Sequence, residues 1–208
     1  MVLDKDIMNN IPFNRPAYIL KSKEYIDEVL AKGHLSGDGD YTKKCNHRLE
    51  EIVGAPKALL TTSCTHALEM SALLLDLKPG DEVIVPSFTF VSTVNAFVLR
   101  GAKPVFIDIR PDTLNLDEKL LERMINSKTK AIYVVHYAGV SCEMDEILAI
   151  AARHHISVVE DNAHGLFGKY KGKMLGSFGA LATQSFHETK NISCGEGGMI
   201  VTDNEEYA

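Results

Sequence analysis

Short apolar runs rich in β-branched residues alternate with amphipathic stretches along most of the chain. The runs are typical of buried strands and span residues 57–62, 82–86, 103–109, 130–136, 156–161, 182–187 and 197–202. Stretches with apolar residues at helical spacing separate several of them, near residues 65–76, 92–100, 117–126 and 143–154. This alternation predicts βαβ units, and therefore an α/β domain whose mostly parallel sheet lies between two layers of helices.

The chain has a different pattern before the first of these strands. In "SKEYIDEVLAKG" the apolar residues recur at helical spacing, which predicts a surface helix over residues 22–33 that ends at Gly33. A glycine-rich stretch, "LSGDGDYT", follows. We therefore divide the chain into an N-terminal segment with its helix, residues 1–36, and a large domain, residues 37–208.

Composition and charge narrow the class of protein. The chain has 208 residues, 45% hydrophobic and 24% charged, which suits one sizeable core. Its formal net charge of -6 disfavours binding to nucleic acid or to an anionic membrane surface. The chain starts without a secretory pattern, and no run approaches the roughly 20 apolar residues of a membrane span. We expect a cytoplasmic protein.

The cysteines give no sign of a metal site or of a disulfide framework. They lie far apart, and no two form a CxxC pair: Cys45, Cys64, Cys142 and Cys194. Because this spacing matches neither zinc-binding nor disulfide-rich sequences, we expect free thiols and no bound metal.

Polar side chains follow five of the seven predicted strands, at the point where each strand ends. The segments are "TTSCTHALEM", "PSFTFVST", "VHYAG", "EDNAHG" and "SFHETKN". Because parallel sheets bind ligands at the carboxyl ends of their strands, we expect these segments to meet at one edge. Together they supply hydroxyls, aromatic rings, an acid, histidines and a lysine, which indicates a cofactor cleft.

A phosphate site is the first candidate within this cleft. Ser63 and Thr65 lie between a strand and a helix, where N–H groups, hydroxyls and the helix dipole favour an anion. A plain N-cap is the alternative for Thr65. A dinucleotide is disfavoured because no strand is followed by GxGxxG, and the P-loop pattern is also absent.

Asp161 and His164 are the candidates for contact with a cofactor ring. A carboxylate bonded to a pyridine nitrogen keeps that nitrogen protonated, which makes pyridoxal 5'-phosphate (PLP) an electron sink. Asp161 ends the strand 156–161 and is placed for this role, although a carboxylate there can also cap a turn. His164 suits the 3-oxygen of the ring, and the alternative is a polar surface histidine.

Lys190 is the candidate nucleophile. An aldehyde cofactor needs a lysine amine that forms a Schiff base, and Lys190 follows the strand 182–187 in a polar loop. The alternative is an ordinary solvated lysine. Phe90, after the strand 82–86, offers a flat face on which a ring can stack, and for Phe90 the alternative is ordinary core.

Three segments resemble the DegT/DnrJ/EryC1 sugar aminotransferases, which are fold type I PLP enzymes. They are "TTSCTHALEMSALLLDLKPGDEVIVPSFTFVSTVNAFVLRGAKPVFIDI", "VVEDNAHG" and "SFHETKNISCGEGGMI". The similarity extends from "IPFNRP" to the last residue. It implies that residues 37–208 form a PLP-binding large domain. The related dehydratase branch has histidine in place of the lysine, so Lys190 argues against that branch.

The resemblance also implies roles for individual residues. Lys190 would be the Schiff-base lysine and Asp161 the partner of the ring nitrogen, while His164 would contact the 3-oxygen and Phe90 would stack on the ring. Asn162 departs from the alanine that is common beside the aspartate. The other positions fall where relatives hold the phosphate: Thr65, the backbone of Cys64 and His66, and Ser185.

The resemblance further implies a reaction and partners. The amino group would pass from glutamate to a 4-keto-6-deoxy sugar nucleotide, a dTDP-4-dehydro-6-deoxy-hexose, in a homo-oligomer. "SGDGDYTKKC", "HYAGVSCEMD" and "SFHETKN" are most similar to the branch that serves enterobacterial common antigen, a cell-surface polysaccharide.

Length is the main departure from this family. Relatives continue past "VTDNEEYA" through a small domain, so we expect this chain to represent only the cofactor-binding part. A catalytically inert fragment and a non-enzymatic regulator are the alternatives from another class. An oxidoreductase ranks lower because no dinucleotide loop is present.

Overall fold

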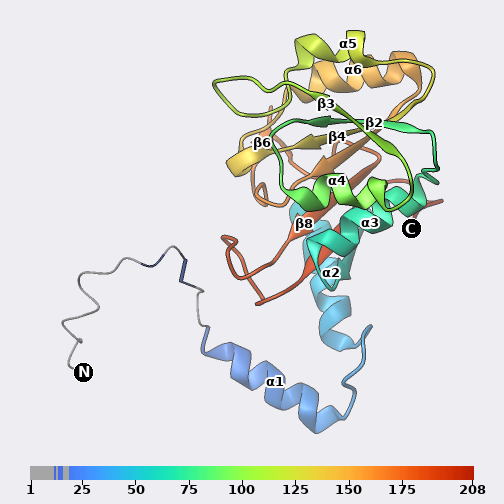
Figure 1. Ribbon diagram of the computed structural model, residues 1–208. Helices are drawn as coiled ribbons and strands as arrows, with labels where there is room; N and C mark the ends of the chain where they lie inside the picture. The colour runs from blue at the N-terminus through green and yellow to red at the C-terminus, as the bar shows by residue number, and fades with distance from the viewer. Residues whose placement is uncertain (1–11, 13, 16–18) are drawn as a thin grey trace.

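A seven-stranded sheet forms the centre of the molecule (Figure 1). The computed structural model describes residues 12, 14–15 and 19–208, so much of the predicted N-terminal segment and of "IPFNRP" lies outside the described residues. The strands are β1 (Lys57–Thr61), β2 (Glu82–Pro86), β3 (Lys103–Ile107), β4 (Thr129–Val135), β5 (Ser157–Asp161), β8 (Leu181–Ser185) and β9 (Gly198–Thr202). All seven predicted strands are confirmed to within about two residues at each end.

The sheet is mostly parallel, as predicted. Its strand order is β1-β9-β8-β5-β4-β2-β3. Each neighbouring pair from β8 to β3 is parallel, whereas β9 runs antiparallel to both β8 and β1. Since β9 is the one reversed strand in this sheet, β1 points the same way as β8.

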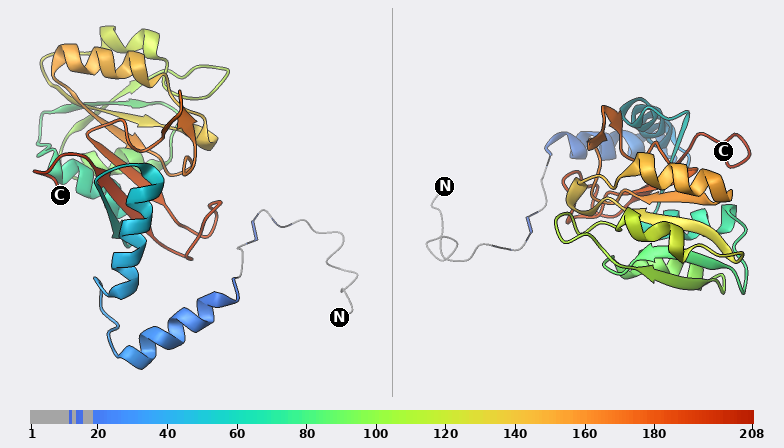
Figure 2. Two further views of the ribbon diagram at one scale, coloured as in Figure 1. Left: turned by 180° about the vertical axis from the view of Figure 1, so that it is seen from behind. Right: turned by 90° about the horizontal axis from the view of Figure 1, so that it is seen from above.

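Helices cover both faces of the sheet (Figure 2). Four predicted helices are confirmed as α1 (Lys21–Lys32), α3 (Cys64–Leu74), α4 (Val91–Val98) and α6 (Met144–His154). The predicted stretch 117–126 forms a 3-10 turn, Glu118–Leu120, followed by the short α5 (Leu121–Met124).

The sequence pattern missed one helix and one hairpin. The helix α2 (Asp40–Val53) follows the glycine-rich stretch and buries only Leu49 and Val53, so its apolar signal is weak. The hairpin consists of two-residue strands, β6 (Lys169–Tyr170) and β7 (Lys173–Met174), which are too short to show any periodicity.

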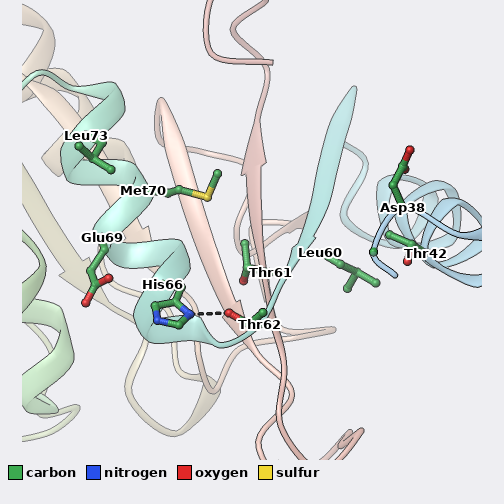
Figure 3. Close-up of a pocket in the computed structure, with 10 residues that line it drawn as sticks. Asp38, Thr42, Leu60, Thr61, Thr62, His66, Glu69, Met70 and Leu73 are labelled. Atoms are coloured by element: carbon green, nitrogen blue, oxygen red, sulfur yellow. Dashed lines mark hydrogen bonds between the residues drawn. The ribbon is translucent and has the colours of Figure 1, made fainter. Parts of the chain in front are cut away.

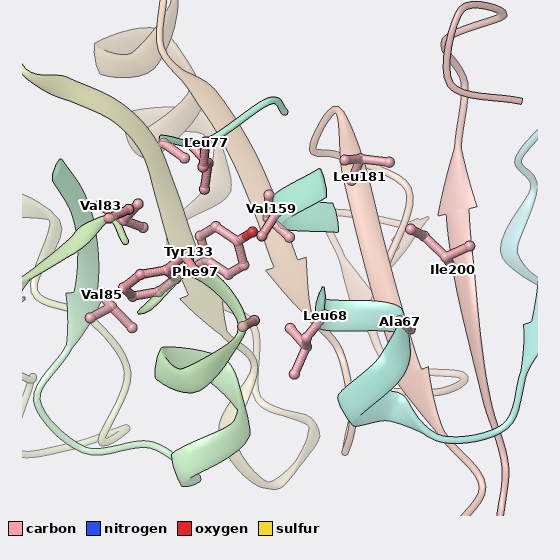
Figure 4. Packing of buried hydrophobic residues seen from close by; sticks show 14 residues of the cluster. Ala67, Leu68, Leu77, Val83, Val85, Phe97, Tyr133, Val159, Leu181 and Ile200 are labelled. Atoms are coloured by element: carbon pink, nitrogen blue, oxygen red, sulfur yellow. The ribbon is translucent and has the colours of Figure 1, made fainter. Parts of the chain in front are cut away.

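Alternation of side chains along the strands divides the core into two parts. Val83, Val85 and Val159 belong to a cluster packed against α3 and α4, which also contains Tyr133 and Phe97 (Figure 4). Ile84 and Val158, each one position away, join the cluster on the opposite face with α5 and α6. Successive side chains point to opposite faces because the side-chain period of a strand is two. Adjacent residues of β5 therefore face different layers.

A buried carboxylate fastens a long loop to the face of the sheet that α6 covers. Glu160 is fully buried and accepts hydrogen bonds from the N–H groups of Gly176, Phe178 and Gly179 at 2.6–2.8 Å. It also accepts from His136 Nε2 at 2.9 Å, while His136 Nδ1 accepts from the N–H of Cys142. Burial alone would raise the pKa of Glu160, but these donors outweigh burial and hold the pKa below its usual range.

The helix α1 lies away from the sheet and has no buried residue, which confirms the predicted surface helix (Figures 1 and 2). It ends at Gly33, whose φ of 71° is left-handed. It contacts the start of α2 through Tyr41, which donates to Glu28 at 2.5 Å, and through the Lys32–Asp40 ion pair. Among the described residues no helix is long and apolar enough to cross a membrane.

We expect Glu160→Gln to destabilise the fold strongly. A glutamine amide turns at least one donor towards the N–H groups and removes the charge that they and His136 stabilise. Loss of one partner of a buried charge cluster costs about 3–5 kcal/mol of unfolding free energy. Urea denaturation with matched circular dichroism and fluorescence transitions measures this loss.

Glu122→Gln is the matched control, because Glu122 pairs with Arg153 and His154 at the surface. Its urea midpoint should stay close to wild type. The pKa of Glu160 is lowered on folding, so its contribution is present above the ordinary glutamate pKa and disappears as the pH falls through the folded-state value. Equal midpoints for the two variants would contradict the role of Glu160.

Candidate functional site

The five polar segments meet at one edge of the sheet. The carboxyl ends of β2, β4, β5 and β8 share an edge because these strands are parallel. The end of β1 joins them because β9 is antiparallel to both β1 and β8. Hydrogen bonds connect the segments directly, from Thr65 to Ser92 and from Thr93 to Asp161. The prediction that these segments meet is confirmed.

The N-terminus of α3 offers unpaired N–H groups. Ser63 is the N-cap, and its hydroxyl accepts from the N–H of His66 at 3.1 Å. The alternative of Thr65 as the N-cap is therefore wrong. Among the described residues, the N–H groups of Cys64 and Thr65 have no hydrogen-bond partner, whereas that of His66 is used by the cap. Two donors at the positive end of the helix are thus available to an anion.

Gly198 brings β9 against this helix terminus. A Cβ at Gly198 would lie 2.4 Å from the backbone nitrogen of Cys64 and 2.4 Å from the carbonyl carbon of Ser63. Gly198 is also the antiparallel partner of Ser185, the last residue of β8. Glycine permits this close approach because it has no Cβ. The backbone of Gly198 therefore lies next to both the buried Ser185 and the N-terminus of α3.

The hydroxyls of Thr65 and Ser185 are both engaged within the chain. Thr65 Oγ1 lies 2.8 Å from the hydroxyl of the buried Ser92, the second residue of α4. Ser185 Oγ accepts from the N–H of His187 at 3.3 Å. The Ser185 hydroxyl accepts this bond and therefore keeps its own proton to donate to a ligand. The Thr65 hydroxyl also keeps its proton when Ser92 is the donor of their bond.

Asp161 is a buried carboxylate without a cation of its own. The residue is 4% exposed, and no lysine, arginine or histidine of the described residues forms an ion pair with it. Oδ2 accepts from Thr93 Oγ1 at 2.6 Å, and Oδ1 accepts from the N–H of Ala163 at 3.2 Å. A buried charge is expected to have a charged or strongly donating partner, so this site suits a cationic ring nitrogen.

The charges of Lys190 and Asp161 both influence the pKa of His164. Partial burial lowers the pKa of His164, the positive charge of Lys190 lowers it further, and the carboxylate of Asp161 opposes them. His164 Nδ1 accepts from the N–H of Ala138 at 3.2 Å, so the neutral ring has its proton on Nε2. The ring is therefore disposed to donate from Nε2, which is the chemistry that contact with a cofactor oxygen needs.

Cys64 lies among the same groups but is a poor nucleophile. Burial raises the pKa of its thiol, and the charge of Asp161 adds to this effect. The thiol donates to Thr183 Oγ1 at 3.7 Å. All four cysteines are free. The backbone of Cys64, and not its sulfur, is the part suited to a ligand.

Phe90 is not part of the core. It is 72% exposed and immediately precedes α4, so the alternative of ordinary core packing is wrong. Two residues before it, Phe88 contacts Tyr137 edge-on with ring centroids 5.0 Å apart, and Tyr137 contacts His164 in the same way at 5.7 Å. An exposed aromatic ring at this edge is available to stack on a ligand.

Asn162 has a structural role that the sequence left unexplained. It is buried, and its amide donates to the carbonyl of Leu175 at 3.2 Å and to Gln184 Oε1 at 3.0 Å. It therefore connects the loop after β5 to the following hairpin and to β8.

One cavity of about 530 Å³ lies elsewhere, between α2, β1 and α3 (Figure 3). Of the predicted site residues only His66 lines it, and His66 Nδ1 bonds to the hydroxyl of Thr62 there. Residues of the first polar segment, Thr61, Thr62 and His66, line this cavity, whereas Asp161 and Ser185 do not.

Sequence reasoning did not assign Ser92 and Thr93, although both fall within the quoted "PSFTFVST". Thr93 follows Phe90 by one helical turn, and its N–H donates to the Phe90 carbonyl at 3.1 Å. The density of hydroxyl residues in this segment was the available signal. Only the tertiary structure shows that the hydroxyl of Thr93 is the one that reaches the acid.

Among the described residues, one edge of this α/β sheet brings together unpaired N–H groups at a helix N-terminus and a buried acid, an arrangement that suits a phosphate-bearing cofactor. The model of the DegT/DnrJ/EryC1/StrS aminotransferase family matches residues 19–208, and the chain belongs to this family. PLP is the cofactor that this membership indicates, and the fold is that of the PLP-dependent aminotransferases.

Three relatives illustrate the similarity. The spore coat polysaccharide biosynthesis protein SpsC of Bacillus subtilis is 41% identical over 198 residues, which are 95% of this chain and 51% of SpsC. The PLP form of Spr1654 from Streptococcus pneumoniae is 33% identical, with a TM-score of 0.88 over 96% of this chain and 54% of that one. DesI with its TDP-sugar product is 34% identical, with a TM-score of 0.88 over 93% and 50%. The chain spans about half the length of the curated relatives it matches.

The residues at this edge fit PLP. The unpaired N–H groups of Cys64 and Thr65 suit its phosphate, and the buried Asp161 suits its ring nitrogen. The exposed face of Phe90 suits its ring. The assignment of each predicted residue to a part of the cofactor remains a prediction.

We expect Ser63→Ala to lower stability and Thr65→Ala to lower PLP affinity. Loss of the Ser63 cap should lower the unfolding free energy of the cofactor-free chain by about 1 kcal/mol. Loss of the Thr65 hydroxyl should weaken PLP affinity by roughly tenfold, because hydrogen bonds to charged groups are worth about 1.5–3 kcal/mol. Thermal melts of the cofactor-free variants and PLP titrations measure the two effects. Wild-type PLP affinity in Thr65→Ala would contradict its role at the phosphate.

Proposed function

We propose that this chain is the cofactor-binding part of a PLP-dependent sugar nucleotide aminotransferase, with the Schiff base on Lys190. The observation that supports this most is the buried carboxylate of Asp161, which has no cationic partner among the described residues. The charges of Asp161 and Lys190 both influence the pKa of His164. Residues 37–208 form the PLP-binding domain in this proposal.

PLP, when bound, supplies an electron sink that stabilises negative charge at the carbon where the amino group is exchanged. Asp161 holds the proton on the ring nitrogen, without which the sink is weak. The Nζ of Lys190, once freed, moves a proton to and from the α-carbon of the amino donor. Thr65, Ser185 and the start of α3 bind the phosphate, and Phe90 covers the ring.

The proposed substrates are glutamate and a dTDP-4-keto-6-deoxy sugar in cell-surface polysaccharide synthesis, with enterobacterial common antigen as the pathway. Family membership supports sugar transamination, and the TDP-sugar product of DesI supports the nucleotide. The part played by SpsC in spore coat polysaccharide supports a surface polysaccharide. A cytoplasmic location follows, because nucleotide sugars are made there.

A homo-oligomer is part of the same proposal. Large apolar side chains are exposed on neighbouring helices, including Met70 and Leu73 on α3 and Val91 and Val98 on α4. Exposed apolar groups of this kind are typical of surfaces that another protein covers.

Borohydride reduction of the PLP-loaded chain should attach the cofactor to Lys190, because reduction fixes a Schiff base at the lysine that formed it. Peptide mapping by mass spectrometry identifies the labelled lysine. Lys190→Ala should abolish the label and the visible absorbance of bound PLP, while Lys173→Ala, a surface control, should retain both. A label on another lysine would overturn the assignment.

Asp161→Asn should impair turnover far more than PLP binding. An amide cannot stabilise a protonated ring nitrogen as a carboxylate does, whereas the phosphate contacts remain. We expect a loss of at least about a hundredfold in glutamate-dependent amination by the full-length enzyme, consistent with the scale of effects from acid–base groups. Parallel losses of affinity and turnover would contradict this role.

A further inference from the structure

Thr93 makes the one side-chain hydrogen bond that Asp161 has among the described residues. Its hydroxyl lies 2.6 Å from Asp161 Oδ2, and both residues are buried. This distance is typical of a charge-assisted bond from a hydroxyl to a carboxylate. The other oxygen, Oδ1, accepts from the N–H of Ala163. Two of roughly four acceptor positions on the carboxylate are thus used by the protein, and the rest remain for a ligand.

The direction of these hydrogen bonds follows from the chemistry of the groups. An ionised carboxylate only accepts, so the Thr93 hydroxyl must donate its single proton to Asp161. Thr93 Oγ1 also lies 2.8 Å from Thr89 Oγ1. Since the proton of Thr93 is already committed, Thr89 must be the donor in that second bond. The hydroxyls form an ordered chain from Thr89 through Thr93 to Asp161.

We propose that Thr93 is a positioning residue that sets the orientation and hydrogen-bonding capacity of the Asp161 carboxylate towards the cofactor ring, with Thr89 as its outer donor. This rests on the proposed function, in which Asp161 faces the ring nitrogen. A donor on Oδ2 withdraws charge from the carboxylate and fixes its rotation. Both effects favour leaving the proton on the ring nitrogen rather than on Asp161.

The start of α4 also carries residues that belong to two other parts of the proposed site. Ser92, next to Thr93, bonds to Thr65 beside the proposed phosphate position, and Phe90 precedes Thr93 by one turn. One short helical segment therefore connects the phosphate side, the ring face and the acid. Loss of the Thr93 hydroxyl removes the bonds to Asp161 and Thr89 and leaves the bond between Thr65 and Ser92 in place.

Crystal structures of the cofactor-free chain test the positioning directly. Thr93→Val has nearly the shape of threonine but no hydroxyl, and we expect the Asp161 carboxylate to rotate away from its wild-type orientation. Thr93→Ser restores the donor and should restore the orientation. An unmoved Asp161 in Thr93→Val would overturn the proposal.

The second measurement uses PLP labelled with ¹⁵N at the ring nitrogen. The nitrogen resonance of the bound cofactor should shift towards the unprotonated position in Thr93→Val, shift less in Thr89→Val, and stay near wild type in Thr93→Ser. Thr202→Val is the matched control, since Thr202 is a buried threonine that bonds to the carbonyl of Ala180. It should lower thermal stability and leave the resonance unchanged.

The two measurements separate this proposal from the proposed function. If the wild-type chain does not bind PLP through Lys190, the proposed function fails, and the cofactor-free structures still decide whether Thr93 positions Asp161. If PLP binds and Thr93→Val gives a wild-type resonance, the proposed function survives and the role of Thr93 is overturned.

Discussion

Two adjacent carboxylates at the end of one buried strand determine how the rest of this structure is organised. Glu160 and Asp161 point to opposite faces of β5 because side chains alternate along a strand. Glu160 meets His136 and three N–H groups on one face, so it fastens the segment around Gly176–Gly179 to the sheet. Asp161 meets a hydroxyl on the other face. The first carboxylate is saturated with donors, and the second retains capacity for a ligand.

The number of donors distinguishes a carboxylate with a structural role, Glu160, from one that can bind a ligand, Asp161. A buried carboxylate with four donors is stable only in its ionised, fully bonded state, which makes it a rigid anchor. A buried carboxylate with a hydroxyl and one N–H donor can accept a further strong donor. The sheet fixes the position of both, because Val134 and Val135 of β4 pair with Glu160 and Asp161 in register. The position of the Asp161 carboxylate is thus fixed by a strand whose other face is locked.

Much of the fold was predictable from the chain. The seven strands of the central sheet and the helices α1, α3, α4 and α6 follow from β-branched runs and from helical spacing, since both patterns are local. The helix α2 was missed because it buries only Leu49 and Val53, and the hairpin β6–β7 because its strands have two residues each. The antiparallel insertion of β9 between β1 and β8 is a matter of long-range pairing, which local patterns do not encode.

The sequence by itself determined which residue types end each strand, and therefore that Asp161, Ser185 and Lys190 belong to one edge of a parallel sheet. Only the tertiary structure decided their partners. It paired the hydroxyl of Thr65 on α3 with that of Ser92 on α4. It also exposed Phe90 and placed Thr93 against Asp161. The physical reason is that strand and helix periods are set by neighbours in the chain, whereas a hydrogen-bond partner is set by the packing of elements distant in the chain.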